Sequence, residues 1–563
     1  MQTGKKHRIK QEEEDTPCVD PVKTEPGLSK RVKLETPEID SLDEKQKEIL
    51  NLCLTGRNVY LTGVGGTGKT FLLHQITSAL RKKHGKDKVV VTASTGVAAL
   101  QACGQTLHSL AGAGVPDVVA DFEKCRKLRD GWRKMAVLII DEVSLLEAAY
   151  IDYLDAMVRE IRHCPDKAFG GLQLIWVADF LQLKGISSGV SLASRCPVVS
   201  NFKSDKIPVH VRQFDAYAFQ TIAFRDAKFV VAELKTIFRQ SEVVMIEALM
   251  KIRRGIVDDS VRAFVASCAQ ELPSDDGIMP TVLYALNKNV EMVNQSKLDA
   301  LPSKEEVYVA RDSVHCDIGS PPWTRDKLLR DPFFKSGPAS DRMVLKVGAQ
   351  VILTQNLDRV LVNGSRGVVK HFETKEKAIE DLTVRIGLCK DDTLRAVLLG
   401  QLDVLRTSPQ ETAYPVVLFR DGCEALCYCV EFSQRVWNAG YCKRYQVPLK
   451  LAWSLSVHRS QGSSLDKVQV DLTGCFAVGQ TYVALSRART TSGLQILGFT
   501  ESAIKADPMA IAFHDALSAG KLDEFMATVP LWFQPVLKPD IDPNWRALFE
   551  SSKVFKSWVD QCK

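Results

Sequence analysis

The sequence predicts an α/β protein with two doubly wound parallel-sheet domains that carry small inserted subdomains. Its 563 residues exceed what one ordinary hydrophobic core can hold, so more than one domain is expected. Short β-branched runs, which suit buried parallel strands, alternate with helical stretches. The alternation occurs before residue 234 and resumes after it, which indicates two separate sheets.

The composition is typical of a globular protein. Hydrophobic residues make up 45% and charged residues 25%, and no apolar window is long enough to span a bilayer. The net charge of +6 is small, which favours basic residues lining a groove over a wholly basic surface. The fifteen cysteines are expected to be core thiols in a reducing compartment, and those at 423–442 lack the paired spacing of a zinc site.

Residues 1–38 are expected to form a disordered tail, because charged clusters and prolines alternate there without a periodic apolar pattern. Two basic clusters, KKHRIK (5–10) and SKRVKLE (29–35), are of the type that import receptors bind. The second resembles a one-part nuclear import signal. We therefore expect an import receptor as a partner and a nuclear location, with the mitochondrion as the alternative.

The first domain is expected over residues 39–233. It begins with a strand, a glycine-rich turn and the start of a helix in NVYLTGVGGTGKTFLL (58–73). A helix is predicted at 150–161, where YIDYLDAMVREI is amphipathic. Further buried strands are predicted in VVVTAST (89–95), VLIIDEVS (137–144) and LQLIWVADF (172–180).

The glycine-rich turn has the spacing G-x-x-x-x-G-K-[ST], between an apolar strand and an apolar helix. Glycines at this density weaken regular structure, so the backbone must approach a ligand closely. In such a loop the N–H groups hold phosphates, the lysine reaches the β- and γ-phosphates, and the hydroxyl binds Mg²⁺. The predicted nucleotide-binding residues are Gly63, Gly65, Gly66, Thr67, Gly68, Lys69 and Thr70.

Two carboxylates, Asp141 and Glu142, end the hydrophobic strand VLIID. Ligands bind at the carboxyl edge of an open α/β sheet, so this pair should lie beside the glycine-rich turn. We expect Asp141 to hold Mg²⁺, partly through water, and Glu142 to orient or deprotonate the attacking water.

The second domain is expected over residues 234–563. Short strands with turns and few helical stretches at 368–447 predict a β insertion of barrel-like form, and a C-terminal helical segment is placed at 500–563. The alternation of strands and helices that defines the domain is read in TVLYALNKNVEMVN (281–294), KVQVDL (467–472) and GLQILG (493–498).

Six further blocks resemble superfamily 1 helicases, most closely the Pif (petite integration frequency) family of DNA helicases in the B subgroup. The resemblance runs from about residue 42 to 516 and implies two RecA-like domains with ATP and Mg²⁺ as cofactors. The blocks are LDEKQKEIL (42–50), TASTGVAAL (92–100) with GQTLHSLAG (104–112), FGGLQLIWVADFLQL (169–183), ELKTIFRQ (233–240), KVGAQVILTQNLDRVLVNGSRGVV (346–369) with PLKLAWSLSVHRSQGSSLDKV (448–468), and GQTYVALSRART (479–490).

The resemblance also implies roles for individual residues. Gln46 would recognise adenine, and Gln182 would link the γ-phosphate to the DNA site. Arg239 and Arg487 would reach the γ-phosphate when the cleft between the domains closes, completing the catalytic set with Lys69, Asp141 and Glu142. The residues implied to grip single-stranded DNA are Thr95, Gly96, Thr106, His108, Asn356, His458 and Ser460.

The chain departs from the family pattern in three places. In the block at 169–183, which resembles the family's third motif, Ala178 precedes Asp179 where the family usually has glycine, and Lys184-Gly185 follows Leu183 where the family usually has two prolines. Arg459 stands where the family usually has lysine, which preserves the charge. A small wedge element that splits the duplex is expected at 113–134, with Val115, Pro116 and Trp132 as its possible handles.

The expected function is an ATP-driven DNA helicase that moves 5′ to 3′, a polarity taken from the family. Single-stranded and forked DNA are the expected partners, with G-quadruplexes and RNA–DNA hybrids as further substrates, in DNA replication, repair, recombination and telomere maintenance. A monomer without membrane contact is expected. The alternatives are a RecA-like motor acting on RNA and an ATP-dependent nucleic-acid clamp that hydrolyses without unwinding, the latter suggested by the altered third motif.

Overall fold

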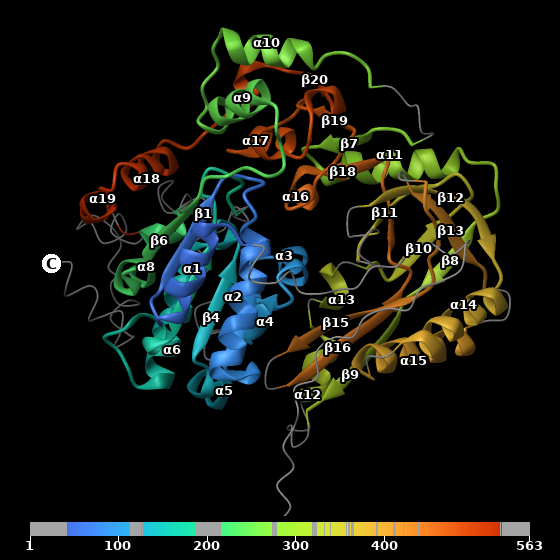
Figure 1. The fold of residues 1–563 in the computed structure, drawn as a ribbon, viewed down its shortest axis with the longest axis horizontal. Helices are drawn as coiled ribbons and strands as arrows, with labels where there is room; N and C mark the ends of the chain where they lie inside the picture. The colour runs from blue at the N-terminus through green and yellow to red at the C-terminus, as the bar shows by residue number, and fades with distance from the viewer. Residues whose placement is uncertain are drawn as a thin grey trace, which may run out of the picture.

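The fold was analysed in a computed structural model (Figure 1). Residues 1–38, with both basic clusters, lie outside the described residues, as do Val115 and Pro116 of the expected wedge and Asn356. The described residues are 42–112, 125, 128–185, 216–272, 278–317, 324–331, 333–337, 339–355, 357, 361, 365–389, 392–408, 412–419, 422–436, 439–529 and 531.

A six-stranded sheet forms the centre of the first domain. All of its pairings are parallel, in the order β3-β2-β4-β5-β1-β6, so the chain crosses over between strands as a doubly wound sheet requires. The four predicted strands are confirmed as β1 (Val59–Gly63), β2 (Val89–Ala93), β4 (Val137–Asp141) and β5 (Gln173–Val177). The sheet also contains two strands that were not predicted, β3 (Gln105–Thr106) and β6 (Val230–Leu234).

Helices cover both faces of this sheet and bury one hydrophobic core on each. In β1, Val59 and Leu61 belong to the core under α1 and α2, whereas Tyr60 belongs to the core under α6 and α8. The alternation follows from the period of two along a strand. The helices are α1 (Glu44–Leu54), α2 (Lys69–His84), α3 (Gly96–Gln101), α4 (Leu107–Ala111), α5 (Arg129–Lys134), α6 (Ala148–Arg162) and α8 (Ile222–Ala227).

The second domain is built on a smaller parallel sheet with the order β18-β7-β19-β20. Both domains therefore have the α/β class that the sequence predicts. The strands are β7 (Thr281–Tyr284), β18 (Ser454–Ser456), β19 (Val468–Asp471) and β20 (Leu494–Leu497), and the helices are α9 (Val243–Arg253), α10 (Asp259–Ser267), α11 (Asn287–Asp299), α16 (Val457–Ser460) and α17 (Gln480–Leu485).

Between α11 and β18 the chain forms an antiparallel β region, on the right of Figure 1. Among the described residues its strands pair as a five-stranded sheet, a three-stranded sheet and a two-stranded ribbon, so the expected barrel-like closure is not seen. The region begins at residue 306 instead of 368. Its strands are β8 (Glu306–Val309), β9 (Arg311–Cys316), β10 (Arg342–Leu345), β11 (Gln350–Leu353), β12 (Arg366–Glu373), β13 (Tyr414–Phe419), β14 (Glu424–Leu426), β15 (Val430–Val436), β16 (Gly440–Gln446) and β17 (Leu449–Leu451).

Two long helices interrupt this β region, so the expectation of few helices at 368–447 is wrong. In α14 the buried residues Ala378, Leu382 and Ile386 recur every four positions, and Thr374 caps the first turn by accepting from the backbone of Lys377. This period was readable in the sequence. The helices of the region are α12 (Thr324–Leu329), α13 (Phe333–Ser336), α14 (Lys375–Leu388) and α15 (Asp392–Thr407).

The C-terminal helices α18 (Pro508–Ser518) and α19 (Leu522–Thr528) pack on the first domain, although the sequence assigned them to the second. Phe513 of α18 stacks on Phe219 and meets the edge of Phe180, both in the first core. Trp132, a possible handle of the expected wedge, is fully buried in the same core. No described helix is long and apolar enough to cross a membrane.

Candidate nucleotide and nucleic-acid site

The glycine-rich turn between β1 and α2 needs glycine for close approach and for backbone shape. A Cβ on Gly63 would lie 2.5 Å from the carbonyl oxygen of Leu234, and one on Gly66 would lie 2.6 Å from the Cβ of Arg239. Gly66 also has a φ of 88°, in the left-handed region that favours glycine. The helix α2 begins at Lys69, so its free N–H groups face the turn, as an anion site requires.

A cavity of about 460 Å³ opens beside this turn. Its walls come from both domains, because Glu142 and Gln182 lie on the first and Gly462 and Ser464 on the second. The lining residues are Gly65, Gly66, Thr67, Gly68, Lys69, Thr70, Phe71, Glu142, Gln182, Phe238, Arg239, Gly462, Ser464, Arg487 and Arg489. The structure thus brings most of the predicted ATP residues to one cleft.

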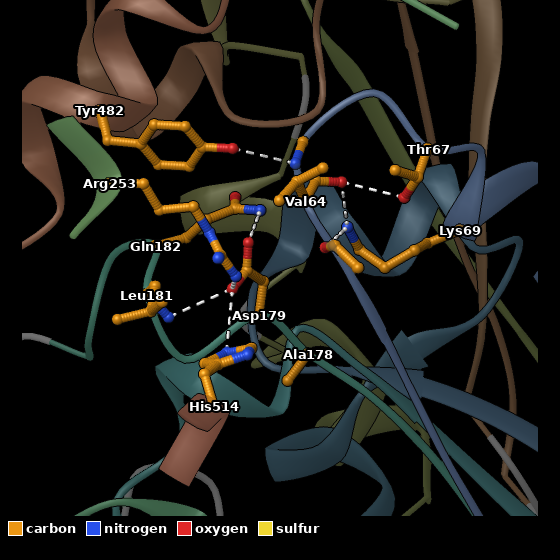
Figure 2. Close-up of polar contacts among 12 residues, drawn as sticks. Val64, Thr67, Lys69, Ala178, Asp179, Leu181, Gln182, Arg253, Tyr482 and His514 are labelled. Carbon is orange, nitrogen blue, oxygen red and sulfur yellow. Dashed lines mark hydrogen bonds and ion pairs between the residues drawn. The ribbon is translucent and has the colours of Figure 1, made fainter. Parts of the chain in front are cut away.

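The Lys69 ammonium folds back on the turn. Its Nζ donates to the carbonyl oxygens of Gly63, at 2.6 Å, and Val64, at 3.0 Å (Figure 2). Burial lowers the pKa of Lys69, and the nearby carboxylates of Asp179 and Glu142 oppose that shift. Two backbone carbonyl dipoles of the turn therefore hold the cation.

Of the two carboxylates at the end of β4, Asp141 is buried and Glu142 is half-buried. Asp141 Oδ1 accepts from the backbone N–H of Glu142 at 2.9 Å, and Glu142 has a left-handed φ of 53°. Burial, followed by the charge of Glu142, raises the pKa of Asp141 to about 7, and burial also raises the pKa of Glu142. Such a pair favours a nearby cation. The hard oxygens of Asp141 and Thr70 suit Mg²⁺, which takes few protein ligands beside substrate phosphates and waters.

Both predicted arginines reach the glycine-rich turn. The position of a Cβ on Gly65 is 3.4 Å from Arg487 Nη2 and 3.5 Å from Arg239 Nη1. Arg239 Nε donates to Ser464 Oγ at 2.8 Å, and Arg487 Nε donates to the Val483 carbonyl at 2.8 Å. Burial, and then the charge of Arg239, lowers the pKa of Arg487 to about 9. An anion bound between these two like charges would be stabilised by both of them.

Gln182 is held by a buried carboxylate, Asp179. Gln182 Nε2 donates to Asp179 Oδ2 at 3.0 Å, which turns the amide nitrogen of the side chain toward Asp179 (Figure 2). Oδ1 of Asp179 accepts from Arg253 Nη2 of α9 at 2.5 Å and lies 3.5 Å from His514 Nε2 of α18. Burial opposes ionisation of Asp179, but Arg253 and His514 outweigh it and hold its pKa far below the usual range.

Asp179→Asn should destabilise the protein, because Arg253 would remain buried without its counter-charge, at a cost of roughly 3–5 kcal/mol. The depressed pKa of Asp179 means that this stabilisation is complete above its unfolded pKa and is lost as the pH falls toward the folded value. Thermal melting of the wild-type and Asp179→Asn proteins from pH 3 to pH 8 should show a difference in melting temperature that is constant above about pH 5 and narrows below about pH 4. A difference that widens in acid would contradict the ion pair.

A second cavity, of about 450 Å³, adjoins the first at Thr67 and Phe238 and is lined further by Asp43, Lys45 and Glu233. Phe238 is 62% exposed, an unusual state for a phenylalanine beside a polar site. Gln46 lies close to Phe238, because its Nε2 is 3.4 Å from the position of a Cβ on Gly68, which Phe238 also approaches. The Oε1 of Gln46 accepts from the Asp43 N–H at 3.2 Å. The flat ring and the amide suit a nucleotide base.

The residues implied to grip DNA fall into two groups. Thr95 and Thr106 are bonded to the first turns of α3 and α4, since their hydroxyls accept from the backbones of Ala98 and Ser109 at 3.2 Å. Gly96 opens α3. The ring of His108 lies 4.4 Å from that of Tyr150, and burial lowers its pKa to about 4, so it is neutral at pH 7.

The other group lies on α16 of the second domain. Burial lowers the pKa of His458, which is therefore neutral as well. Ser460 is fully buried and its hydroxyl donates to the Val457 carbonyl at 2.8 Å, so its side chain does not face solvent in this state. The DNA roles of both residues stay predictions.

Four residues of the site were missed by sequence reasoning: Phe238, Arg253, Tyr482 and His514. Phe238 and Tyr482 could have been found, because they lie in the two blocks that carry Arg239 and Arg487. Arg253 and His514 carry no local signal. They come to the site from α9 and α18 through the tertiary fold.

The glycine-rich phosphate loop (P-loop) and the acidic pair lie at the edge of one parallel sheet, and they are faced by two arginines that donate hydrogen bonds to residues of the second parallel-sheet domain. These features define a two-domain RecA-like motor ATPase. A family model described as PIF1-like helicase matches residues 41–211, and one described as DNA helicase Pif1, 2B domain, matches residues 334–372. The chain belongs to the PIF1-like helicase family, as its relatives also show.

One relative is the ATP-dependent DNA helicase PIF1 of Danio rerio, 35% identical over 88% of this chain and 67% of that protein. The chain thus spans about two thirds of the length of that relative. The crystal structure of Pif1 helicase from Candida albicans is 32% identical, with a TM-score of 0.62 over 84% of this chain and 99% of that one. Bacteroides Pif1 bound to ssDNA is 25% identical, with a TM-score of 0.52 over 85% of this chain and 98% of that one.

Proposed function

We propose that this protein is an ATP-dependent DNA helicase that moves 5′ to 3′ along single-stranded DNA and separates forked duplexes. The observation that carries the proposal is the cleft in which Lys69 faces Arg239 and Arg487. The helicase name of the Danio relative and the ssDNA complex of Bacteroides Pif1 support the choice of DNA. One chain supplies both walls of the cleft, so a monomer suffices.

The geometry supports a cycle of domain closure. The γ-phosphoryl group carries negative charge that Lys69, Arg239 and Arg487 neutralise from opposite walls, which closes the cleft. Mg²⁺, held at Thr70 and Asp141, would neutralise charge on the phosphate oxygens. Glu142 accepts the proton of the attacking water, and loss of the γ-phosphate removes the anion that held the arginines. If each domain grips DNA differently in the two states, the cycle becomes stepping.

The altered third motif does not disturb this arrangement. Gly185 approaches the Leu145 carbonyl so closely that a Cβ would lie 2.4 Å from it, and Lys184 Nζ lies 3.9 Å from the centre of the Tyr217 ring. Gln182 keeps its place in the cleft. This geometry favours a coupled motor over the alternative clamp.

Strand displacement with paired 5′-tailed and 3′-tailed duplexes tests the proposal. We expect ATP-dependent release of the 5′-tailed DNA strand alone. RNA versions, RNA–DNA hybrids and G-quadruplex substrates extend the assay to the other expected partners. Hydrolysis stimulated by DNA without strand release would favour the clamp, and release of the RNA duplex alone would favour the RNA motor.

We further propose that the protein acts in the nucleus in genome maintenance, through an import receptor bound to the tail. Deletion of residues 1–38 should abolish nuclear accumulation and leave hydrolysis and unwinding unchanged, because the tail has basic clusters and no core pattern. Microscopy of a tagged truncation, with the purified truncation assayed in parallel, checks both statements. A truncation still concentrated in the nucleus would refute the import role.

A further inference from the structure

Tyr482 of α17 makes a direct contact between the second domain and the P-loop. Its side chain is fully buried, and its hydroxyl oxygen accepts the backbone N–H of Gly65 at 3.1 Å (Figure 2). The two residues are 417 positions apart, so only domain packing brings them together. Tyr482 is therefore placed to respond to changes at the P-loop.

The hydroxyl lies where two cations converge. The position of a Cβ on Gly65 is 3.4 Å from the Tyr482 oxygen, 3.4 Å from Arg487 Nη2 and 3.5 Å from Arg239 Nη1. These cations are the groups that the proposed function assigns to the γ-phosphate. The Tyr482 hydroxyl thus borders the position assigned to the γ-phosphate.

The hydroxyl hydrogen of Tyr482 has no acceptor among the described residues. A phenol can accept one hydrogen bond and donate another. Within the described part of the chain, the hydroxyl accepts from Gly65 but donates to no group. Burial raises the pKa of Tyr482, so the hydrogen stays in place at any working pH. A buried donor without an acceptor is costly, and a phosphate oxygen would satisfy it.

We propose that Tyr482 is a γ-phosphate-reading residue, whose hydroxyl donates to the γ-phosphoryl group of ATP while it accepts from Gly65. The inference rests on the proposed ATPase function. ADP lacks the acceptor, so Tyr482 distinguishes ATP from ADP and favours the closed cleft only with ATP. A ligand shifts a conformational equilibrium only through such a differential contact.

Tyr482→Phe tests this in the full-length protein, because it removes only the hydroxyl and keeps the buried ring. Calorimetric titration with Mg²⁺ and AMP-PNP should show an affinity about tenfold weaker than wild type, and titration with ADP should show no change. The value of kcat/KM for DNA-stimulated ATP hydrolysis should fall by a similar factor.

Tyr308→Phe is the matched control, because Tyr308 is also a buried tyrosine but lies in the β region. Its hydroxyl donates to the carbonyl of Ala413 at 2.7 Å. It should leave both nucleotide affinities unchanged. Equal losses of AMP-PNP and ADP affinity in Tyr482→Phe, with a lower melting temperature, would show a structural brace and overturn the inference.

Unchanged AMP-PNP affinity would overturn it as well. These results differ from failure of the proposed function, which would show as wild-type protein without DNA-stimulated hydrolysis.

Discussion

Lys69→Ala should abolish ATP hydrolysis while leaving single-stranded DNA binding within about threefold of wild type. The β- and γ-phosphates lose the P-loop cation, and electrostatic stabilisation of this kind is the main source of rate in phosphoryl transfer. Removal of the ammonium also frees two backbone carbonyls, of Gly63 and Val64, that water can solvate in the open cleft. The fold should therefore survive the change, since a buried charge disappears with it.

Lys82→Ala is the matched control, because Lys82 is an exposed lysine on the same helix, α2. Turnover with saturating single-stranded DNA, filter binding of the same DNA and thermal melting on one preparation of each variant give the comparison. Loss of DNA affinity in parallel with hydrolysis would contradict separate nucleotide and DNA sites. Normal turnover in Lys69→Ala would contradict the assignment of the P-loop.

Arg487 carries the second large effect. An arginine that reaches the transferred phosphoryl group contributes roughly three to five orders of magnitude in rate in related enzymes, so Arg487→Ala should reduce hydrolysis on that scale. Nucleotide binding should fall much less, because the P-loop still holds the phosphates. Arg487→Lys should not restore turnover fully, since an ammonium cannot present the planar fork of a guanidinium.

The surroundings of Arg487 decide how this experiment is controlled. Its guanidinium donates to Val483 O, Ser463 O and Ser486 Oγ, all within the second domain. Arg487→Ala removes these donors from a fully buried place and should also lower the melting temperature. Arg487→Gln keeps one donor and much of the volume. Stable Arg487→Gln protein with near-normal turnover would refute the catalytic role, whereas stable, inactive protein with retained ADP affinity would support it.

The nucleotide half of the site was largely predictable because its residues are local in sequence. The P-loop glycines, Lys69 and Thr70 lie within one turn between a strand and a helix, and the spacing itself states the chemistry. Asp141 and Glu142 were found because the end of a buried parallel strand faces the ligand edge of the sheet. The two arginines came from the family resemblance, and the structure brings both to the cleft.

The two long helices of the β region were predictable from the sequence. The apolar residues of α14 and α15 follow a helical period, but short strands on both sides of these helices obscure it in the sequence. The absence of a closed barrel among the described residues could not have been foreseen, because strand pairing depends on contacts between strands that are far apart in sequence, such as β9 and β16.

The sequence by itself determined that this protein has two parallel sheets, a P-loop and an acidic pair, because strand burial, helix period and turn chemistry are written in neighbouring residues. Only the tertiary structure decided which distant groups complete the site. Arg253 and His514 converge on Asp179, and the helix α18 returns to the first domain, through packing of side chains more than 70 positions apart in sequence. Such contacts leave no periodic trace in the chain, since they depend on how the two sheets and their helices pack together.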